Sequence, residues 1–202
     1  MTAEATSPPG VEAAGPDLVR SALRRHAKGV AVVTVGGERP AGFCVTSLAS
    51  LSLDPPLLSF TVGLRSGSWE AVRGATHVMV QLLAAGQEEV ARAFAGPRHA
   101  RFGPGTSWHR DPLGLPALDG VLARFVLTPV SMRPVGDHAL LIGLVVRADR
   151  VTEAGPLVHH DGTFVDLPVP PGTPGATDST GTTGTTGTTG TTGTTSTTGA
   201  RH

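Results

Sequence analysis

Short apolar runs separated by glycine, proline and polar residues dominate the chain up to residue 168. β-branched residues are frequent in these runs, and the run lengths are typical of strands. Strands are predicted at residues 29–35, 41–46, 51–53, 57–62, 77–83, 121–128 and 138–151. Pro55 and Pro56 mark a boundary, because adjacent prolines cannot donate to a central ladder. Many short antiparallel strands of this kind favour a β-barrel.

Helices are predicted where apolar residues recur at helical spacing. The first has Asp17 as its expected N-cap and ends at Gly29. Short helices at residues 69–73 and 87–95 are each followed by a glycine that ends them. Residues 98–120 are rich in turn-forming residues, and we expect them to form mainly loop.

The C-terminal segment differs in composition from the rest of the chain. Proline, glycine and threonine dominate from residue 169, and Thr-Thr-Gly triplets repeat between residues 181 and 199. Such a segment has almost no apolar area to bury against its chain entropy. We therefore expect a disordered segment at residues 1–16, one folded domain at 17–168 and a disordered tail at 169–202. A spacer or decorated stalk is the alternative role for the tail.

The charge and cysteine content narrow the class of protein. Sixteen basic and sixteen acidic residues give a formal net charge of zero, so no general attraction to nucleic acid is expected. No apolar run approaches the length of a membrane span, and the first residues lack the features of a signal peptide. The single cysteine, Cys44, excludes an internal disulfide. We expect a cytoplasmic protein with neither a nucleic-acid nor a membrane partner.

Two polar clusters in the first half of the chain carry candidate chemistry. In the segment 42–56, hydroxyl groups lie among apolar residues and can line a flat pocket while bonding to polar ring edges. Ordinary strand and turn serines are the alternative there. The second cluster is the segment 65–69, where two serines and an arginine at a helix start would suit a phosphate. Simple helix capping is its alternative.

A third cluster is the Gly136-Asp137-His138 turn, which binds a ligand or only fixes the turn. No zinc-ligand spacing is present, and the adjacent His159 and His160 would point to opposite faces of a strand. We therefore expect no metal site. The Gly-x-Ser-x-Gly, Walker and Gly-x-Gly-x-x-Gly motifs are also missing from the sequence.

Taken in order, these clusters resemble the flavin reductase-like family, whose fold is the FMN-binding split barrel. The resemblance runs from about Leu18 to Leu167. Its motifs are His26-x-x-Gly29-Val30, Gly42-x-x-x-Thr46-Ser47-Leu48-x-Ser50-Leu51-Ser52-Leu53-Asp54-Pro55-Pro56, Ser66-x-Ser68-Trp69, Phe94-Ala95, Arg101-Phe102, Trp108 and Gly136-Asp137-His138.

The resemblance implies a mainly β, antiparallel, Greek-key-like barrel with short helices. It also implies a homodimeric enzyme that transfers a hydride from NADH or NADPH to FMN or FAD. Members of the family often supply reduced flavin to a separate monooxygenase. A flavin-binding module without turnover, or another flavin-dependent oxidoreductase on the same barrel, is the alternative function. The Gly-Asp-His turn favours the enzyme, because a passive binder has no need of a nicotinamide side.

The family's site residues transfer onto this chain by position. The segment beside the flavin ring and ribityl chain corresponds to Thr46, Ser47, Leu48, Ala49, Ser50, Ser52 and Leu53. The phosphate end corresponds to Ser66 and Ser68, with Arg65 and Trp69 beside them, and Arg101 and Phe102 lie in a loop that reaches the flavin. Asp137 and His138 fall on the nicotinamide side. Packing is the alternative role for Trp69. His26, at the end of the first helix, faces the nicotinamide or only caps and packs there.

Overall fold

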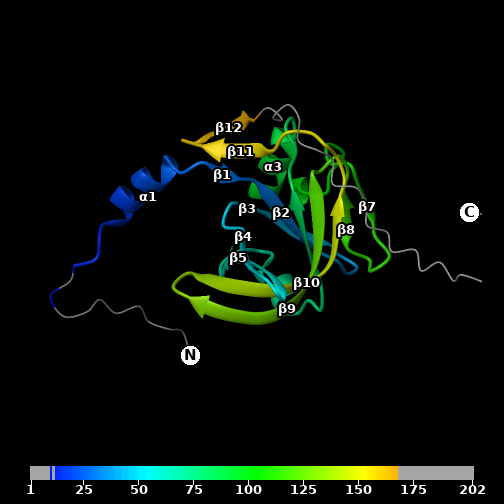
Figure 1. The fold of residues 1–202 in the computed structure, drawn as a ribbon, viewed down its shortest axis with the longest axis horizontal. Coiled ribbons are helices and arrows are strands. Elements are labelled where there is room, and N and C mark those ends of the chain that lie inside the picture. Colours follow the sequence, from blue (N-terminus) through cyan, green and yellow to red (C-terminus); the bar gives the residue numbers. More distant parts are fainter. Residues whose placement is uncertain (1–9, 11, 168–202) are drawn as a thin grey trace, which may run out of the picture. The chain divides into compact units, whose positions relative to one another are not determined.

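The computed structural model describes residue 10 and residues 12–167 (Figure 1). The predicted tail at 169–202 and most of the predicted N-terminal segment lie outside the described residues. The helices are α1 (Pro16–Arg24), α2 (Trp69–Arg73), α3 (Glu88–Ala95) and a 3-10 helix (Arg98–Ala100). The strands are β1 (Lys28–Gly29), β2 (Ala31–Val35), β3 (Ala41–Val45), β4 (Ala49–Leu53), β5 (Pro56–Gly63), β6 (Val78–Leu82), β7 (Trp108–Arg110), β8 (Pro116–Leu118), β9 (Ala123–Val135), β10 (His138–Arg150), β11 (Leu157–His160) and β12 (Thr163–Asp166). The prediction of a mainly β chain with short helices is confirmed.

Seven strands form one antiparallel sheet in the order β3-β2-β6-β9-β10-β5-β4. Its two edge strands, β3 and β4, are consecutive in the sequence and are separated only by residues 46–48. Such a connection spans at most about 15 Å, since Cα atoms are about 3.8 Å apart along the chain. The sheet therefore has to curve until its edges approach each other, which closes it into a barrel (Figure 1).

The described core contains three clusters, and the two larger ones lie on opposite faces of this curved sheet. One cluster is built from the strands themselves and contains Val33, Phe43, Phe60 and Leu141. The other cluster joins β2 to α3 and to the segment around β11, with members such as Val32, Leu83, Phe94 and Leu157. All five residues of β2 are buried, because this strand faces a core layer on both sides. Each fully buried side chain of this size contributes about 1.5–3 kcal/mol to the free energy of unfolding.

Gly42 lets α3 lie directly against β3. A Cβ atom at Gly42 would lie 2.6 Å from Cε1 of Phe94 and 3.0 Å from the carbonyl oxygen of Val33. Only a residue without a side chain therefore permits this close approach. The contact positions the end of α3 and the chain that follows it beside the junction between β3 and β4.

Strand β9 is longer than predicted and continues to Val135, past Pro129 and Pro134. Residues 123–127 of β9 pair with β6, whereas among the described strands the rest of β9 pairs only with β10. The prolines lie in the part of β9 that has one free edge, where a missing N–H removes no ladder bond. The prediction that the strand ends at residue 128 is wrong for this reason.

Three other local predictions also need correction. The expected loop at 98–120 contains the 3-10 helix and the hairpin of β7 and β8. A small sheet of β1, β11 and β12 was not predicted, because its strands are only two to four residues long. Helix α1 has Gly15 rather than Asp17 as its N-cap, since Pro16 suits the first helical position. Among the described residues, no helix is long and apolar enough to cross a membrane.

Candidate functional site

Ser47 lies just before β4, at the end of the ladder that pairs β4 with β5. Ala49 is the first residue of β4 to pair, with Ser59 of β5, so the next rung of the ladder would join Ser47 to Thr61. The Ser47 side chain takes over that rung: its Oγ accepts hydrogen bonds from the Thr61 backbone N–H at 3.0 Å and from the Thr61 hydroxyl at 2.9 Å. With both lone pairs occupied, the Ser47 O–H remains free to donate to a ligand.

A polar cleft of about 350 Å³ opens beside Ser47 and Thr61. Its walls come from β3, β5, the end of α3, the loop that follows α3 and the start of β10. The lining residues are Phe43, Cys44, Val45, Thr46, Ser47, Thr61, Val62, Gly63, Ser66, Phe94, Ala95, Arg101 and His138. Its volume is within the range of small-molecule sites in proteins. Five of the predicted site residues meet here, from four separate parts of the sequence.

One end of the cleft is formed by the turn at residues 66–68, called turn 66–68 below. The Ser66 Oγ accepts a hydrogen bond from the Ser68 backbone N–H at 3.2 Å, which leaves the Ser66 O–H free to donate. Ser68 is fully buried, and its hydroxyl donates to the Gly42 carbonyl at 3.0 Å. Ser66 thus faces the cleft, whereas Ser68 is a support behind it. Helix α2 is too short for its N-terminus to form an anion site.

Arg101 joins three walls of the cleft. Its Nη1 donates to the Gly42 carbonyl at 2.6 Å and to the Ser68 hydroxyl at 2.8 Å, while Nε and Nη2 donate to the Gly96 carbonyl at 3.3 and 3.0 Å. All of these acceptors are neutral. Burial and the charge of Arg98 both lower the pKa of Arg101. An anion in the cleft would therefore meet a positive charge that these partners leave uncompensated.

His138 and Asp137 lie in the tight turn between β9 and β10, where His138 pairs with Gly63 of β5. The His138 Nδ1–H donates to Asp137 Oδ1 at 2.7 Å. This hydrogen bond, followed by the charge of the imidazole, lowers the pKa of the Asp137 carboxyl. With Nδ1 occupied, the Nε2 atom of a neutral ring is an acceptor. Nε2 lies 3.8 Å from the position that a Cβ would take at Gly63, so the ring lies beside this residue of β5.

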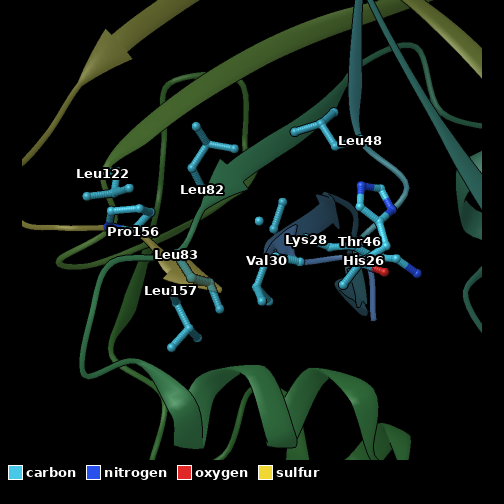
Figure 2. Close-up of a pocket in the computed structure, with 13 residues that line it drawn as sticks. His26, Lys28, Val30, Thr46, Leu48, Leu82, Leu83, Leu122, Pro156 and Leu157 are labelled. Carbon is cyan, nitrogen blue, oxygen red and sulfur yellow. The ribbon is translucent and has the colours of Figure 1, made fainter. Parts of the chain in front are cut away.

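A second cavity, also of about 350 Å³, adjoins the cleft at Thr46 (Figure 2). Leu82, Leu83 and Leu157 form its apolar side. His26 and Lys28 lie with Thr46 at the other side of the view in Figure 2. Leu48, another predicted site residue, also lines it. A polar cleft next to an apolar cavity can hold a flat aromatic ring that carries an anionic chain.

The structure does not bring all of the predicted residues to the cleft. Ala49, Ser50 and Leu53 are exposed on the edge strand β4, where Ser52 is half-buried. Arg65 is exposed, and its charge contributes to lowering the pKa of Asp137.

Two aromatic residues predicted at the site pack in the interior instead. Trp69 packs against the strand core. Phe102 makes edge contacts with Phe94 and Trp108, with ring centroids 5.1 and 5.2 Å away. Their large apolar rings gain more from this burial than from a place in a polar cleft.

Several cleft residues were not predicted from the sequence. Thr61 and Gly63 belong to an ordinary strand pattern, and the pairing of β5 with β4 and β10 brings them to Ser47 and His138. Burial raises the pKa of the Cys44 thiol to about 11, so this residue is a protonated packing group. Within the part of the chain that the structure describes, no three His, Cys, Asp or Glu residues are placed to hold a metal ion.

Residues 23–168 match the family described as flavin reductase like domain. An NADH:FMN oxidoreductase of Rhodococcus erythropolis is 39% identical over 150 residues, which cover 72% of this chain and 78% of that protein. The flavin-dependent monooxygenase reductase subunit HsaB of Mycobacterium tuberculosis is 32% identical over 155 residues, which cover 75% of this chain and 82% of that protein.

Solved structures of flavin reductases are also similar to this chain. BorF, the flavin reductase component of a bacterial two-component tryptophan halogenase, superposes with a TM-score of 0.70 at 33% identity, covering 76% of this chain and 99% of that chain. The NADH:FAD oxidoreductase SgcE6 of Streptomyces globisporus, in complex with NAD and FAD fragments, gives 0.72 at 29% identity, covering 78% and 97%. The expected split-barrel fold is confirmed. This protein belongs to the flavin reductase-like domain family.

Proposed function

We propose that this protein is an NAD(P)H:flavin oxidoreductase, which transfers a hydride from NADH or NADPH to FMN or FAD. The observation that carries the proposal is the junction at Thr46 between a polar, cationic cleft and an apolar cavity. A flavin nucleotide has matching parts: a flat ring system and a chain that ends in phosphate. The names of the relatives, which include NADH:FMN oxidoreductase and NADH-dependent flavin reductase, support the same activity.

A bound flavin supplies the redox chemistry, because its N5 atom accepts the hydride. The chain's own task is to bind, orient and exclude water. Thr46 lines both the cleft and the apolar cavity, and Ser47 lines the cleft beside it. Both side chains would donate hydrogen bonds to the polar edge of the ring. Such donors stabilise the negative charge that develops at that edge.

The phosphate end would lie at turn 66–68. The Ser66 hydroxyl has a free proton, and Arg101 provides positive charge behind it. Ser68 acts indirectly, because its hydroxyl is held between Gly42 and Arg101. Its role in this proposal is to position the turn rather than to contact phosphate.

The hydride donor would approach from the side of His138. Asp137 holds the imidazole through Nδ1, so the ring keeps one orientation and presents Nε2 as an acceptor. An acceptor at this position suits the carboxamide of a nicotinamide. We assign no general base, because hydride transfer requires none.

We also propose that the protein is a homodimer that supplies reduced flavin to a separate monooxygenase. Helix α1 supports the dimer: none of its residues is buried, and Leu18 and Leu23 are 69% and 51% exposed. A nine-residue helix is marginal in water without a packing partner, and a second copy would provide one. HsaB and BorF are reductase components of two-component systems, which supports the monooxygenase partner. The domain boundaries at 17 and 168 and a cytoplasmic location stay predictions from the sequence.

The experiment is to mix the purified protein with NADH or NADPH and with FMN or FAD, and to follow the absorbance of the reduced nicotinamide. We expect flavin-dependent oxidation with at least one combination. Oxidation no faster than in the protein-free blank would refute the reductase. If flavin titration still showed binding in that case, the protein would be a flavin-binding module without turnover.

A further inference from the structure

Arg98 lies along the outer side of turn 66–68. It is the first residue of the 3-10 helix that follows α3, and its side chain is at the surface. Its Cδ atom is 3.8 Å from the position that a Cβ would take at Gly67, the middle residue of the turn. Arg101 holds the same turn from the inside, through the bond from Nη1 to the Ser68 hydroxyl. Two arginine side chains therefore flank one turn.

The charges of this pair are not balanced by the protein. In the described part of the chain, neither Arg98 nor Arg101 forms an ion pair with a carboxylate, whereas Arg73 pairs with Glu70 and Arg92 pairs with Glu88. Burial is the larger cause of the lowered pKa of Arg101, and the charge of Arg98 is close enough to lower it further. Like charges held together around a turn destabilise each other, and an anion bound at the turn would remove that cost.

The remaining charges near the cleft do not supply such an anion. Arg65, which precedes the turn, is another cation, and the carboxylate on which its charge acts, Asp137, accepts a hydrogen bond from His138. The free O–H of Ser66 also points to an acceptor as the missing partner at the turn. A hydroxyl donor and two cations around one backbone turn match the chemistry of a phosphate group.

We propose that Arg98 is a specificity residue, which makes this protein select phosphorylated flavins over riboflavin by attracting the phosphate to turn 66–68. The proposal rests on the flavin reductase function proposed above and deepens it. Arg98 acts through charge and not through packing, because its side chain is exposed and forms no hydrogen bond with the described residues. Riboflavin has the same ring and ribityl chain without phosphate, so it is the reference ligand.

The test is a fluorescence titration of FMN, FAD and riboflavin into the wild type, Arg98→Ala, Arg98→Lys and the control Arg73→Ala. We expect Arg98→Ala to weaken FMN binding about threefold to tenfold, the size of a solvent-exposed charge interaction with a dianion, and to leave riboflavin binding unchanged. Arg98→Lys should restore most of the loss, since the charge is retained. Arg73→Ala removes the same charge from an ion-paired position and should leave the ratio of FMN to riboflavin affinity as in the wild type.

Salt gives a second readout, because added ions screen an exposed charge. The preference of the wild type for FMN over riboflavin should fall as salt is added, and that of Arg98→Ala should change less. If Arg98→Ala lost affinity equally for all three flavins, or lost none, the proposed role of Arg98 would be overturned. Wild-type turnover would still support the reductase in that case. A wild type that neither binds nor reduces any flavin would overturn the proposed function itself.

Discussion

Ser47 and Thr61 are joined by two hydrogen bonds at the end of the β4–β5 ladder, although they lie 14 residues apart in the sequence. The Ser47 side chain extends the pairing of β4 with β5 beyond the last backbone rung. The bonds also fix the direction of the remaining Ser47 proton. The same residue therefore ties the segment before β4 to β5 and presents a donor to the cleft, which couples stability to ligand binding.

Ser47→Ala should lower both properties. The Thr61 N–H loses its acceptor, the Ser47 Oγ, so we expect the free energy of unfolding to fall by about 1–2 kcal/mol. Flavin affinity should fall about tenfold, because a donor to the ring edge is lost. Urea unfolding and fluorescence titration measure the two effects. Ser131→Ala, on β9 and outside the cleft, is the control. Wild-type affinity in Ser47→Ala would show that its hydroxyl faces no ligand.

Arg101→Lys tests whether Arg101 works by geometry or only by charge. Lysine keeps the charge but cannot reach Gly42, Ser68 and Gly96 together. We expect a loss of about 1–3 kcal/mol of stability, from buried acceptors left without donors. FMN affinity should also fall, even though the charge remains. Equal stability and affinity in Arg101→Lys and the wild type would leave charge as its sole contribution.

His138→Ala should slow turnover without weakening flavin binding. The loss of one hydrogen bond to the hydride donor corresponds to roughly a tenfold decrease in kcat/KM for the nicotinamide. Asp137→Asn should have a smaller effect, because the amide oxygen can still accept from Nδ1. The exposed His160→Ala is the control. A decrease in flavin affinity as large as that in kcat/KM would place His138 on the flavin side.

The His138→Ala variant also tests the pKa of Asp137. The hydrogen bond from His138 depresses this pKa in the folded protein. The carboxylate therefore contributes stability above the ordinary carboxyl pKa, and that contribution is lost as the pH falls through the depressed value. In a carbon NMR titration, His138→Ala should move the Asp137 pKa upward, toward its ordinary value. An unmoved midpoint would mean that the pair is not formed in solution.

Cys44 should react slowly with alkylating reagents. Burial raises its pKa to about 11, so the reactive thiolate is scarce in the folded protein at mildly alkaline pH. We expect alkylation at least roughly tenfold slower than in urea, and slower still with FMN, because Cys44 lines the cleft. The neutral thiol contributes stability below its ordinary pKa, and this is lost as the pH rises through about 11. Fast alkylation of the native protein would show that the thiol is accessible.

Leu23→Lys should disrupt the proposed dimer. The side chain is 51% exposed on α1, and burial of a lysine charge at an apolar interface is costly. Light scattering should give a dimer for the wild type and a smaller species for the variant. Leu113→Lys, at an equally exposed leucine in the turn between β7 and β8, should remain dimeric. A monomeric wild type would remove the dimer from the proposal.

Much of the local structure follows from the sequence, because strand runs and helix ends are encoded by neighbouring residues. The runs that became β2, β3, β5 and β10 were predicted close to their observed bounds. Strand β9 was not, since its prolines are tolerated only where a sheet edge is free. Whether a strand segment has one neighbour or two depends on the whole sheet.

By itself, the sequence determined a β-barrel class and the ordered motifs that contain Thr46, Ser47, Ser66 and His138. The tertiary structure decided which of those side chains face a common space. Ser66 faces the cleft and Ser68 lies behind it, two residues away, because only Ser68 meets the Gly42 carbonyl and Arg101. Such partners come from segments far apart in the chain, and hydrogen bonding acts over a few ångströms of space, whatever the separation along the sequence.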